Sequence, residues 1–145
     1  VFANLKTGTS RGEMFKALLE GITFHFVDAI DAMKRTGICP DSFIASGGSS
    51  RSDAWMQMRA DILGMPFTRL AVGEGSLTGA AMLAAVGAGM FSSHDEAKAA
   101  YVAHGRTFTP DTARHEQYRE TFSLYKRLYP SLKPLLKDLN AVKPA

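Results

Sequence analysis

The sequence predicts an α/β fold that is rich in helices and has few strands. Two short apolar runs bounded by turn residues, at 41–46 and 67–71, are typical of buried strands. About five other segments repeat apolar residues every three or four positions, which is the period of an amphipathic helix. Because two strands make a poor sheet alone, we expect further strands of the same domain to lie outside these 145 residues.

Length and composition indicate one globular domain. The chain is 46% hydrophobic and 21% charged, and its net charge of +3 comes without any basic run, so we expect no nucleic-acid partner. The most apolar run, 77–91, is too short to cross a bilayer, and the N-terminus lacks a signal-peptide pattern. A single cysteine, Cys39, fits a reducing compartment. We therefore expect a cytoplasmic protein with no membrane partner.

The first helix is expected over 11–34, with Gly37 placed to end it. Its apolar residues would form one inward-facing stripe, made of Met14, Leu18, Ile22, Phe26, Ile30 and Met33. His25 lies beside this stripe, so we expect a buried histidine with a hydrogen-bond partner.

The second helix is expected after Ser52, a residue type that often caps a helix N-terminus. Trp55, Met58 and Ile62 would form its inner face, so Trp55 is expected in the core rather than stacked on a ligand. Gly64 and the proline that follows it would end the helix.

Three more helices are expected further along the chain. A turn at 73–76 precedes a small-residue helix over 77–86, and a capping box at 93–96 opens a short helix to about Val102. The last helix opens at 109–111, with proline at its first helical position. Pro130 and Pro134 are expected to break it.

A glycine turn, Ser46-Gly47-Gly48-Ser49-Ser50-Arg51-Ser52, joins the first strand to the second helix. Glycine lets bare backbone approach a ligand, and the free N–H groups of a helix start attract anions. Open α/β sheets bind nucleotides at such carboxyl ends of strands. Taken alone, however, two glycines in a turn more often serve as a plain connection, so the surrounding sequence decides.

The surrounding residues resemble the FGGY family of carbohydrate kinases in four segments. Segment 47–66 is similar to the family's adenosine-binding motif, through Gly47-Gly48, Arg51-Ser52, Trp55, Gln57, Ala60-Asp61, Gly64 and Pro66. The other three segments are Glu74 with Gly79-Ala80-Ala81 and 84–89, the helix at 11–24, and a closing helix with Tyr118, Tyr125 and 128–130.

The resemblance implies an actin-like ATPase fold of the ribonuclease H-like type. It identifies 1–145 as the C-terminal nucleotide-binding portion of a kinase, without the first domain and the start of the second. It implies transfer of the γ-phosphoryl group of ATP, with Mg²⁺, to a hydroxyl of a sugar or polyol, and it favours a pentulose-like substrate. The implied partners are ATP or ADP, a sugar bound through the missing domain, and a second copy in a homodimer of the full-length enzyme.

The resemblance also implies which residues contact the nucleotide. Gly47 and Gly48 would pass close to its sugar and phosphates, and Ser52 would lie beside the adenine. Ser49 stands where the family usually has a third glycine, so it adds a side chain at a position of close approach. Glu74 would accept backbone hydrogen bonds and hold the adenine-side loops, or it would be a favourable acid at a helix N-terminus.

We assign no catalytic residue and no metal ligand to this chain. Phosphoryl transfer needs a base, carboxylates for Mg²⁺ and a phosphate cradle. The segment 7–10 has the composition of a phosphate loop but directly precedes the first helix, downstream of where the family has that loop. His25, His94, His104 and His115 show no metal-ligand spacing with Cys39. We therefore expect the isolated chain to be inactive, and a non-catalytic partner or interaction module derived from such a kinase is the alternative.

Overall fold

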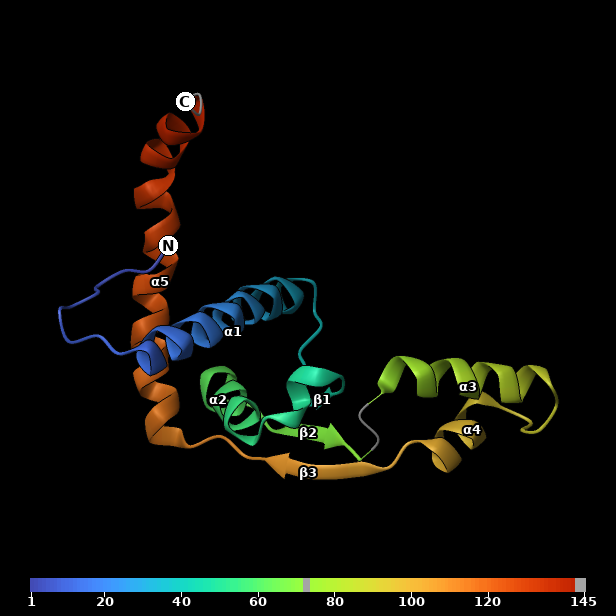
Figure 1. Ribbon diagram of the computed structural model, residues 1–145. Helices are drawn as coiled ribbons and strands as arrows, with labels where there is room; N and C mark the ends of the chain where they lie inside the picture. The colour runs from blue at the N-terminus through green and yellow to red at the C-terminus, as the bar shows by residue number, and fades with distance from the viewer. Residues whose placement is uncertain (72–73, 143–145) are drawn as a thin grey trace.

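The computed structural model describes residues 1–71 and 74–142, and it shows a small sheet covered by helices (Figure 1). Within these residues the elements follow in the order α1 Arg11–Arg35, β1 Phe43–Ala45, the 3₁₀-helix η1 Gly48–Arg51, α2 Asp53–Leu63, β2 Phe67–Leu70, α3 Gly75–Gly87, α4 His94–Tyr101, β3 His104–Phe108 and α5 Thr112–Ala141. The predicted α/β class, rich in helices and with few strands, is confirmed.

The sheet has the order β1-β2-β3. β1 and β2 are parallel, with Phe43 opposite Phe67, and α2 forms the crossover between them. β3 is antiparallel to β2, with Phe108 opposite Phe67. β3 was not predicted from the sequence because its residues, His-Gly-Arg-Thr-Phe, contain no apolar run. Pairing with β2 orders this edge strand, helped by a 2.9 Å hydrogen bond between the hydroxyls of Thr68 and Thr107.

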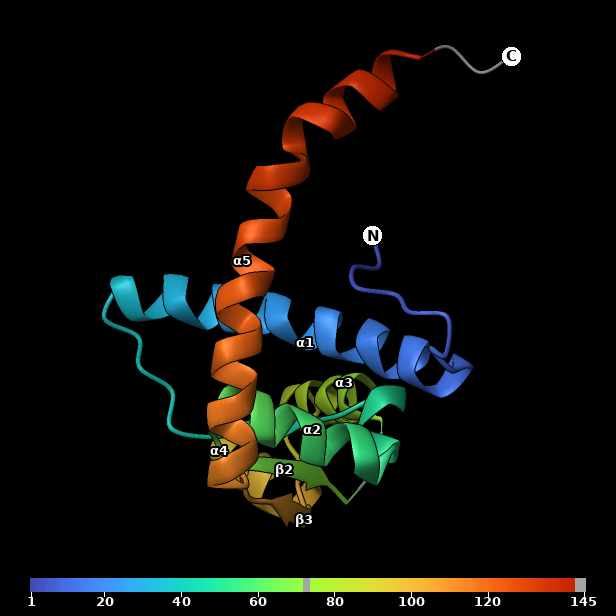
Figure 2. The same cartoon turned by 90° about the vertical axis from the view of Figure 1, so that its left-hand side faces the viewer.

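The core lies where α2 packs between the sheet and the two long helices α1 and α5 (Figure 2). Its buried members come from five elements: Ile30, Ala45, Met56, Ala60, Leu63, Phe67 and Phe108. The inner face predicted for α2 is correct for Ile62, which is buried, whereas Trp55 and Met58 are half-buried.

α1 packs with a different face from the one predicted. Thr23 and Phe24 are buried, whereas five of the six residues in the predicted stripe are exposed and Ile30 alone is buried. Phe24 decides the face, because its ring lies 5.2 to 6.2 Å from the rings of three aromatic residues of α5. His25 is exposed, so the prediction of a buried histidine is wrong.

The ends of the first two helices follow local sequence rules. Gly37, at φ +86°, ends α1 as predicted, with backbone hydrogen bonds that close the last turn. Gly64 ends α2 in the left-handed conformation, also as predicted. Ser10 forms a reciprocal capping box with Glu13 at the start of α1, which gives segment 7–10 a structural role.

α5 does not break at its prolines. The helix runs through Pro130 and Pro134 to Ala141, and it curves along its second half (Figure 2). Both prolines are exposed, so water can solvate the carbonyls that lose an N–H partner. The helix also begins two residues later than predicted, at Thr112, because Asp111 is the N-cap and Pro110 precedes it.

α3 and α4 pack on each other and lie beyond the end of the sheet (Figure 1). The predicted helix over 77–86 is confirmed and starts earlier, at Gly75. The predicted turn at 73–76 includes Gly73, which lies outside the described residues. Ser93 caps α4 as predicted, but the predicted capping box is incomplete, because the Glu96 carboxylate accepts hydrogen bonds from the backbone N–H and hydroxyl of Ser92 and not from Ser93. In the part of the chain that the structure describes, no helix has the length and apolarity to cross a membrane.

Candidate functional site

The glycine turn follows β1 and reverses the chain into two helical segments. Gly47 has φ +83° and ψ −177°, a conformation that requires glycine. Gly48 begins η1 with ordinary backbone angles, and a Cβ built on it meets nothing within 4 Å. The backbone at Gly48 is therefore open to a ligand or to another chain, and this chain does not itself need glycine there.

A buried serine fixes the shape of this turn. The Ser50 side chain is fully buried, and its hydroxyl donates a 2.7 Å hydrogen bond to the carbonyl of Gly47. Ser49, the residue in place of a third glycine, is half-buried beside it. The role of Ser50 was not predictable from the sequence, in which the hydroxyl-rich composition of the turn was the only signal.

Ser52 lies at the N-terminus of α2, where its side chain caps the helix as predicted. Its hydroxyl oxygen accepts a 3.3 Å hydrogen bond from the backbone N–H of Trp55. The hydroxyl proton remains available to a ligand, because Ser can donate and accept at once. The position combines an exposed hydroxyl with the partial positive charge of a helix N-terminus.

Glu74 lies at the N-terminus of α3, and its side chain forms no capping hydrogen bond. Its carboxylate instead accepts a 3.0 Å hydrogen bond from the guanidinium of Arg51, the last residue of η1. Both side chains are exposed, so this ion pair contributes little stability. It does bring Glu74 to the glycine turn, together with the other predicted site residues.

The start of α3 also contacts the end of β1 directly. A Cβ on Gly75 would lie 2.6 Å from the hydroxyl oxygen and 2.9 Å from the Cβ of Ser46. Only glycine allows this approach, and the sequence analysis did not identify its role. The N-terminus of α3 thus meets the end of β1 and the 3₁₀-helix η1 that precedes α2, near the carboxyl ends of the parallel strands β1 and β2.

Three arginines surround a shallow hollow of about 480 Å³ next to the turn. Asp53 binds two of them, Arg69 and Arg106, at 2.7 Å each. Arg69 also donates to the backbone carbonyl of Ser50 at 3.2 Å, which ties β2 to the glycine turn. With Arg51, three cations face two carboxylates here, so the hollow favours an anionic group. The sequence analysis did not predict this cluster, since its members are far apart along the chain.

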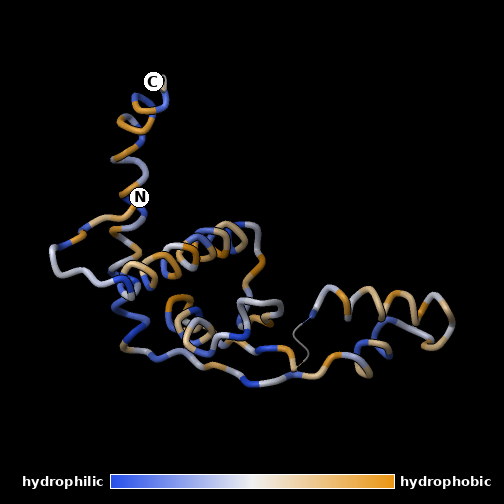
Figure 3. Tube along the Cα trace, in the orientation of Figure 1, coloured by the Kyte–Doolittle hydropathy of each residue, from blue (hydrophilic) through white to orange (hydrophobic). Residues whose placement is uncertain are grey.

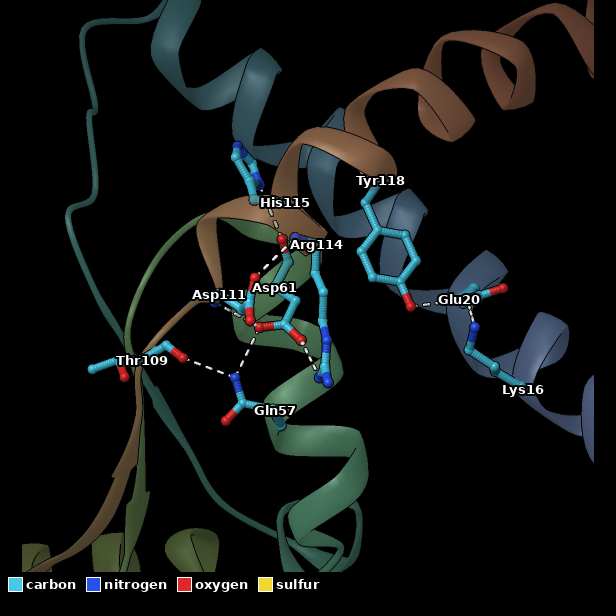
Figure 4. A network of polar contacts seen from close by, with 9 residues as sticks. All are labelled: Lys16, Glu20, Gln57, Asp61, Thr109, Asp111, Arg114, His115 and Tyr118. Carbon is cyan, nitrogen blue, oxygen red and sulfur yellow. Dashed lines mark hydrogen bonds and ion pairs between the residues drawn. The ribbon is translucent and has the colours of Figure 1, made fainter.

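A buried carboxylate near the C-terminal end of α2 holds the start of α5 in place (Figure 4). The Asp61 side chain is 2% exposed. It accepts hydrogen bonds from the Gln57 amide at 2.8 Å, the Asp111 N–H at 2.9 Å and the Arg114 guanidinium at 3.4 Å. His115 contacts the Asp61 carbonyl at 2.9 Å through its Nδ1 atom. This network fixes the first turn of α5 against α2.

A separate set of polar contacts joins α5 to α1 through Tyr118 (Figure 4). Its hydroxyl donates a 2.9 Å hydrogen bond to Glu20, which Lys16 also contacts at 3.1 Å. Burial and the hydrogen bond to Glu20 both raise the pKa of the Tyr118 phenol above its ordinary value. The phenol is therefore a stable donor at neutral pH.

The comparison with known families decides the identity of the chain. Residues 1–88 match the C-terminal domain of the FGGY family of carbohydrate kinases. The chain belongs to this family. It is 33% identical over 138 residues to the xylulose kinase of Staphylococcus epidermidis, covering 95% of this chain and 28% of that protein. The xylulose kinase of Bacillus subtilis is likewise 33% identical, over 92% of this chain and 27% of its own length.

A solved structure of an FGGY kinase shows the same arrangement. The crystal structure of xylulose kinase from Rhodospirillum rubrum is 36% identical and superposes with a TM-score of 0.80, covering 93% of this chain and 28% of that one. The expected actin-like ATPase fold is thereby confirmed. The chain spans less than a third of the length of these relatives.

The residues around the glycine turn fit one of the two expected cofactors, the nucleotide, but not the other, Mg²⁺. The open backbone at Gly48, the two helix N-termini and the arginine-lined hollow fit an anionic nucleotide. The nearby carboxylates do not fit Mg²⁺, because Asp53 and Glu74 are each neutralised by arginine. Over residues 1–71 and 74–142, no three His, Cys, Asp or Glu residues gather closely enough to hold a metal ion.

Proposed function

We propose that this chain is the nucleotide-binding portion of an ATP-dependent sugar kinase that phosphorylates a hydroxyl of a pentulose-like sugar. The observation that carries the proposal is the open glycine turn at the carboxyl ends of β1 and β2, flanked by the N-termini of α2 and α3. Family membership supports a carbohydrate kinase, and the xylulose kinases among the relatives support a pentulose as the sugar.

In this proposal each residue of the turn contacts a different part of the nucleotide. Gly47, Gly48 and Ser49 run along the ribose and the phosphates, where the missing Cβ of Gly48 leaves room for the ligand. Ser52 lies beside the adenine and offers its hydroxyl proton. Glu74 acts through Arg51, which it holds at the edge of the turn.

The rest of the reaction would be supplied from outside this chain. The base, the Mg²⁺ ligands and the sugar site are expected in the first domain and at the start of the second, and closure of the two domains would exclude water. We therefore expect the isolated chain to bind ATP or ADP and to show no kinase activity. Homodimerisation of the complete enzyme stays a prediction.

The first test is calorimetric titration of ADP into the purified chain, with and without Mg²⁺. Saturable binding is expected. Gly48→Ala should weaken it at least tenfold, because the added methyl group occupies the space of close approach. The matched control is Gly87→Ala, at another glycine whose added Cβ meets nothing within 4 Å, and it should leave binding unchanged. Ser52→Leu should also weaken binding.

Circular dichroism of each variant separates loss of the site from loss of the fold. A folded wild-type chain that binds no ADP, or a Gly48→Ala variant that binds as tightly as Gly87→Ala, would refute the proposed site. Sugar-dependent release of ADP by the chain alone would refute the predicted inactivity.

A non-catalytic interaction module derived from such a kinase is the second candidate. The observation that favours it is the amount of apolar surface that the chain leaves exposed on α1, α3 and the second half of α5. A chain that associates with a partner polypeptide but never restores sugar-dependent ADP release would support this alternative over the kinase.

A further inference from the structure

A crevice of about 460 Å³ lies where α5 crosses α1, next to the C-terminal end of α2. Figure 2 shows the crossing of the two long helices, and Figure 3 shows apolar and polar positions interleaved along both. Four apolar side chains, each buried or half-buried, line the crevice from these three helices and form its floor: Val27, Ile62, Leu63 and Phe122. The volume lies within the range of sites that bind small molecules.

This crevice lies at the opposite end of α2 from the glycine turn. Ser52 caps the start of α2, whereas Ile62 and Leu63 are its last two residues. An α-helix of 11 residues is about 16 Å long. Among the described residues, none lines both the crevice and the arginine-lined hollow beside the turn. A ligand in the crevice would therefore leave the proposed nucleotide site free.

Cations outnumber carboxylates in the lining of the crevice. Lys34 of α1 and both Arg119 and Lys126 of α5 line it, against one carboxylate, that of Asp31. Across the residues that the structure describes, neither lysine forms an ion pair, whereas Arg119 pairs with Glu116. Both lysines are exposed, so their ammonium groups can reorient toward a ligand. The crevice therefore offers an anion two unpaired cations, one from each long helix.

His115 also lines the crevice, and its ring orientation is fixed. Its Nδ1 atom lies 2.9 Å from the carbonyl oxygen of Asp61, and because a carbonyl only accepts, Nδ1 carries the proton in this contact. The ring packs on the backbone of Gly64, where an added Cβ would lie 2.6 to 2.9 Å from three ring atoms. The other ring nitrogen, Nε2, is left to accept a hydrogen bond or, once protonated, to donate one to an anion.

We propose that this crevice binds an organic phosphate, which Lys34 and Lys126 hold by its phosphate group while its apolar part lies on the floor. A phosphate monoester carries nearly two negative charges at neutral pH, which suits two cations without carboxylate partners. The Lys126 ammonium lies 4.9 Å from the centre of the Phe122 ring, so charge and apolar surface meet in one place. The proposal goes beyond the proposed function, since it concerns a second site on the chain.

The test is calorimetric titration of phenyl phosphate into this chain, with inorganic phosphate and phenol as comparison ligands. Phenyl phosphate should bind saturably, with a dissociation constant of about 1 mM or lower. Inorganic phosphate lacks the apolar part and phenol lacks the charge, so each should bind about tenfold more weakly. Circular dichroism checks that every variant is folded.

The decisive variant replaces both lysines of the crevice. Lys34→Gln combined with Lys126→Gln should weaken phenyl phosphate binding about tenfold, and both side chains are exposed, so the core is spared. The matched control is Lys133→Gln combined with Lys137→Gln, which removes the same charge from exposed positions of α5 that do not line the crevice. The control should bind phenyl phosphate like the wild-type chain.

Proton NMR of the four histidine rings locates the bound ligand. The His115 signal, assigned by its loss in His115→Gln, should shift during the titration. The signals of His25, His94 and His104 should not, because these residues do not line the crevice. The inference is overturned if phenyl phosphate does not bind, if inorganic phosphate binds as tightly, if the two lysine pairs behave alike, or if another histidine shifts instead.

ADP titration separates this site from the proposed nucleotide site. The double substitution at Lys34 and Lys126 should leave ADP binding unchanged, and Gly48→Ala should leave phenyl phosphate binding unchanged. Loss of ADP binding in the lysine variant would overturn the inference, because the crevice would then be the nucleotide site itself. Phenyl phosphate binding by a chain that binds no ADP would refute only the proposed nucleotide site.

Discussion

The two sides of α2 bury opposite charges in opposite ways. Asp61 and Arg59 stand two residues apart on this helix, and each is at most 9% exposed. Asp61 faces α5 and receives three hydrogen bonds on its carboxylate. Arg59 faces the outer edge of α1, and its buried Nε atom has no partner. On one side of α2 the buried charged group is fully hydrogen-bonded, and on the other side a buried nitrogen has no hydrogen-bond partner.

This difference shows which contacts the chain completes by itself. The donors to Asp61 come from α2 and from the start of α5, so folding of the 145 residues is sufficient to satisfy it. A buried guanidinium nitrogen without an acceptor, such as Arg59 Nε, instead costs free energy. We infer that the α5 side stabilises the chain, whereas the Arg59 side does not.

The largest effect is expected from Asp61→Ala. The substitution leaves three donors without their acceptor in a buried site, so the free energy of unfolding should fall by about 3–5 kcal/mol. Urea unfolding followed by circular dichroism measures the change. The control is Glu116→Ala, which removes an exposed ion pair on α5 and should change stability by less than about 0.5 kcal/mol. Equal effects of the two substitutions would contradict the comparison.

Arg59→Leu should act in the opposite direction. Leucine keeps an apolar side chain against Trp55 and removes the unsatisfied buried charge, so the free energy of unfolding should rise by about 1–2 kcal/mol. The same urea experiment applies, and Arg127→Leu is the control, since an exposed arginine should give a change near zero. A loss comparable to that of Asp61→Ala would mean that Arg59 is already satisfied within the chain.

Local sequence rules predicted most helix ends and the first two strands, because these depend on neighbouring residues. Gly37, Ser52 and Gly64 act where capping chemistry requires them. β3 and the inner face of α1 depend on distant partners instead. β3 is ordered by pairing with β2, and an apolar pattern on two faces of α1 does not reveal which face this chain covers.

The residues of the candidate site likewise fall into those that could be predicted from neighbouring sequence and those that could not. The glycine turn was visible in the sequence because the residues that follow it, among them Arg51-Ser52 and Trp55, resemble the family's adenosine-binding motif, whereas the two glycines alone would fit a plain connection. Gly75 and the arginines around Asp53 were not, since their contacts join residues far apart along the chain, 16 positions for Arg69 and 53 for Arg106. Ser50 contacts Gly47 only three positions away, but a serine in a hydroxyl-rich turn does not by itself reveal which hydroxyl is buried. Proline also misled the prediction for α5, because an exposed helix can continue through Pro130 and Pro134 when water solvates the freed carbonyls.

The smallest change in the free energy of unfolding is expected at Tyr118, whose hydroxyl joins α5 to Glu20 of α1. Tyr118→Phe should lower the free energy of unfolding by about 0.5–1 kcal/mol at neutral pH, through loss of the hydrogen bond to Glu20. The sign of the pH dependence follows from the raised pKa of the phenol in the folded chain. Its contribution is fully present below the unfolded pKa of about 10 and is lost as the pH rises above that value.

The free energy of unfolding, measured at several pH values between neutral and about pH 11, should therefore decrease less with rising pH for Tyr118→Phe than for the wild-type chain. Tyr129→Phe is the matched control, because Tyr129 is 65% exposed on the same helix and should follow the wild type. If both variants lose the same stability at alkaline pH, the hydrogen bond to Glu20 does not hold α5 on α1. The hydrogen bonds to Asp61 would then be the polar contacts that hold α5 in place, without a contribution from Tyr118.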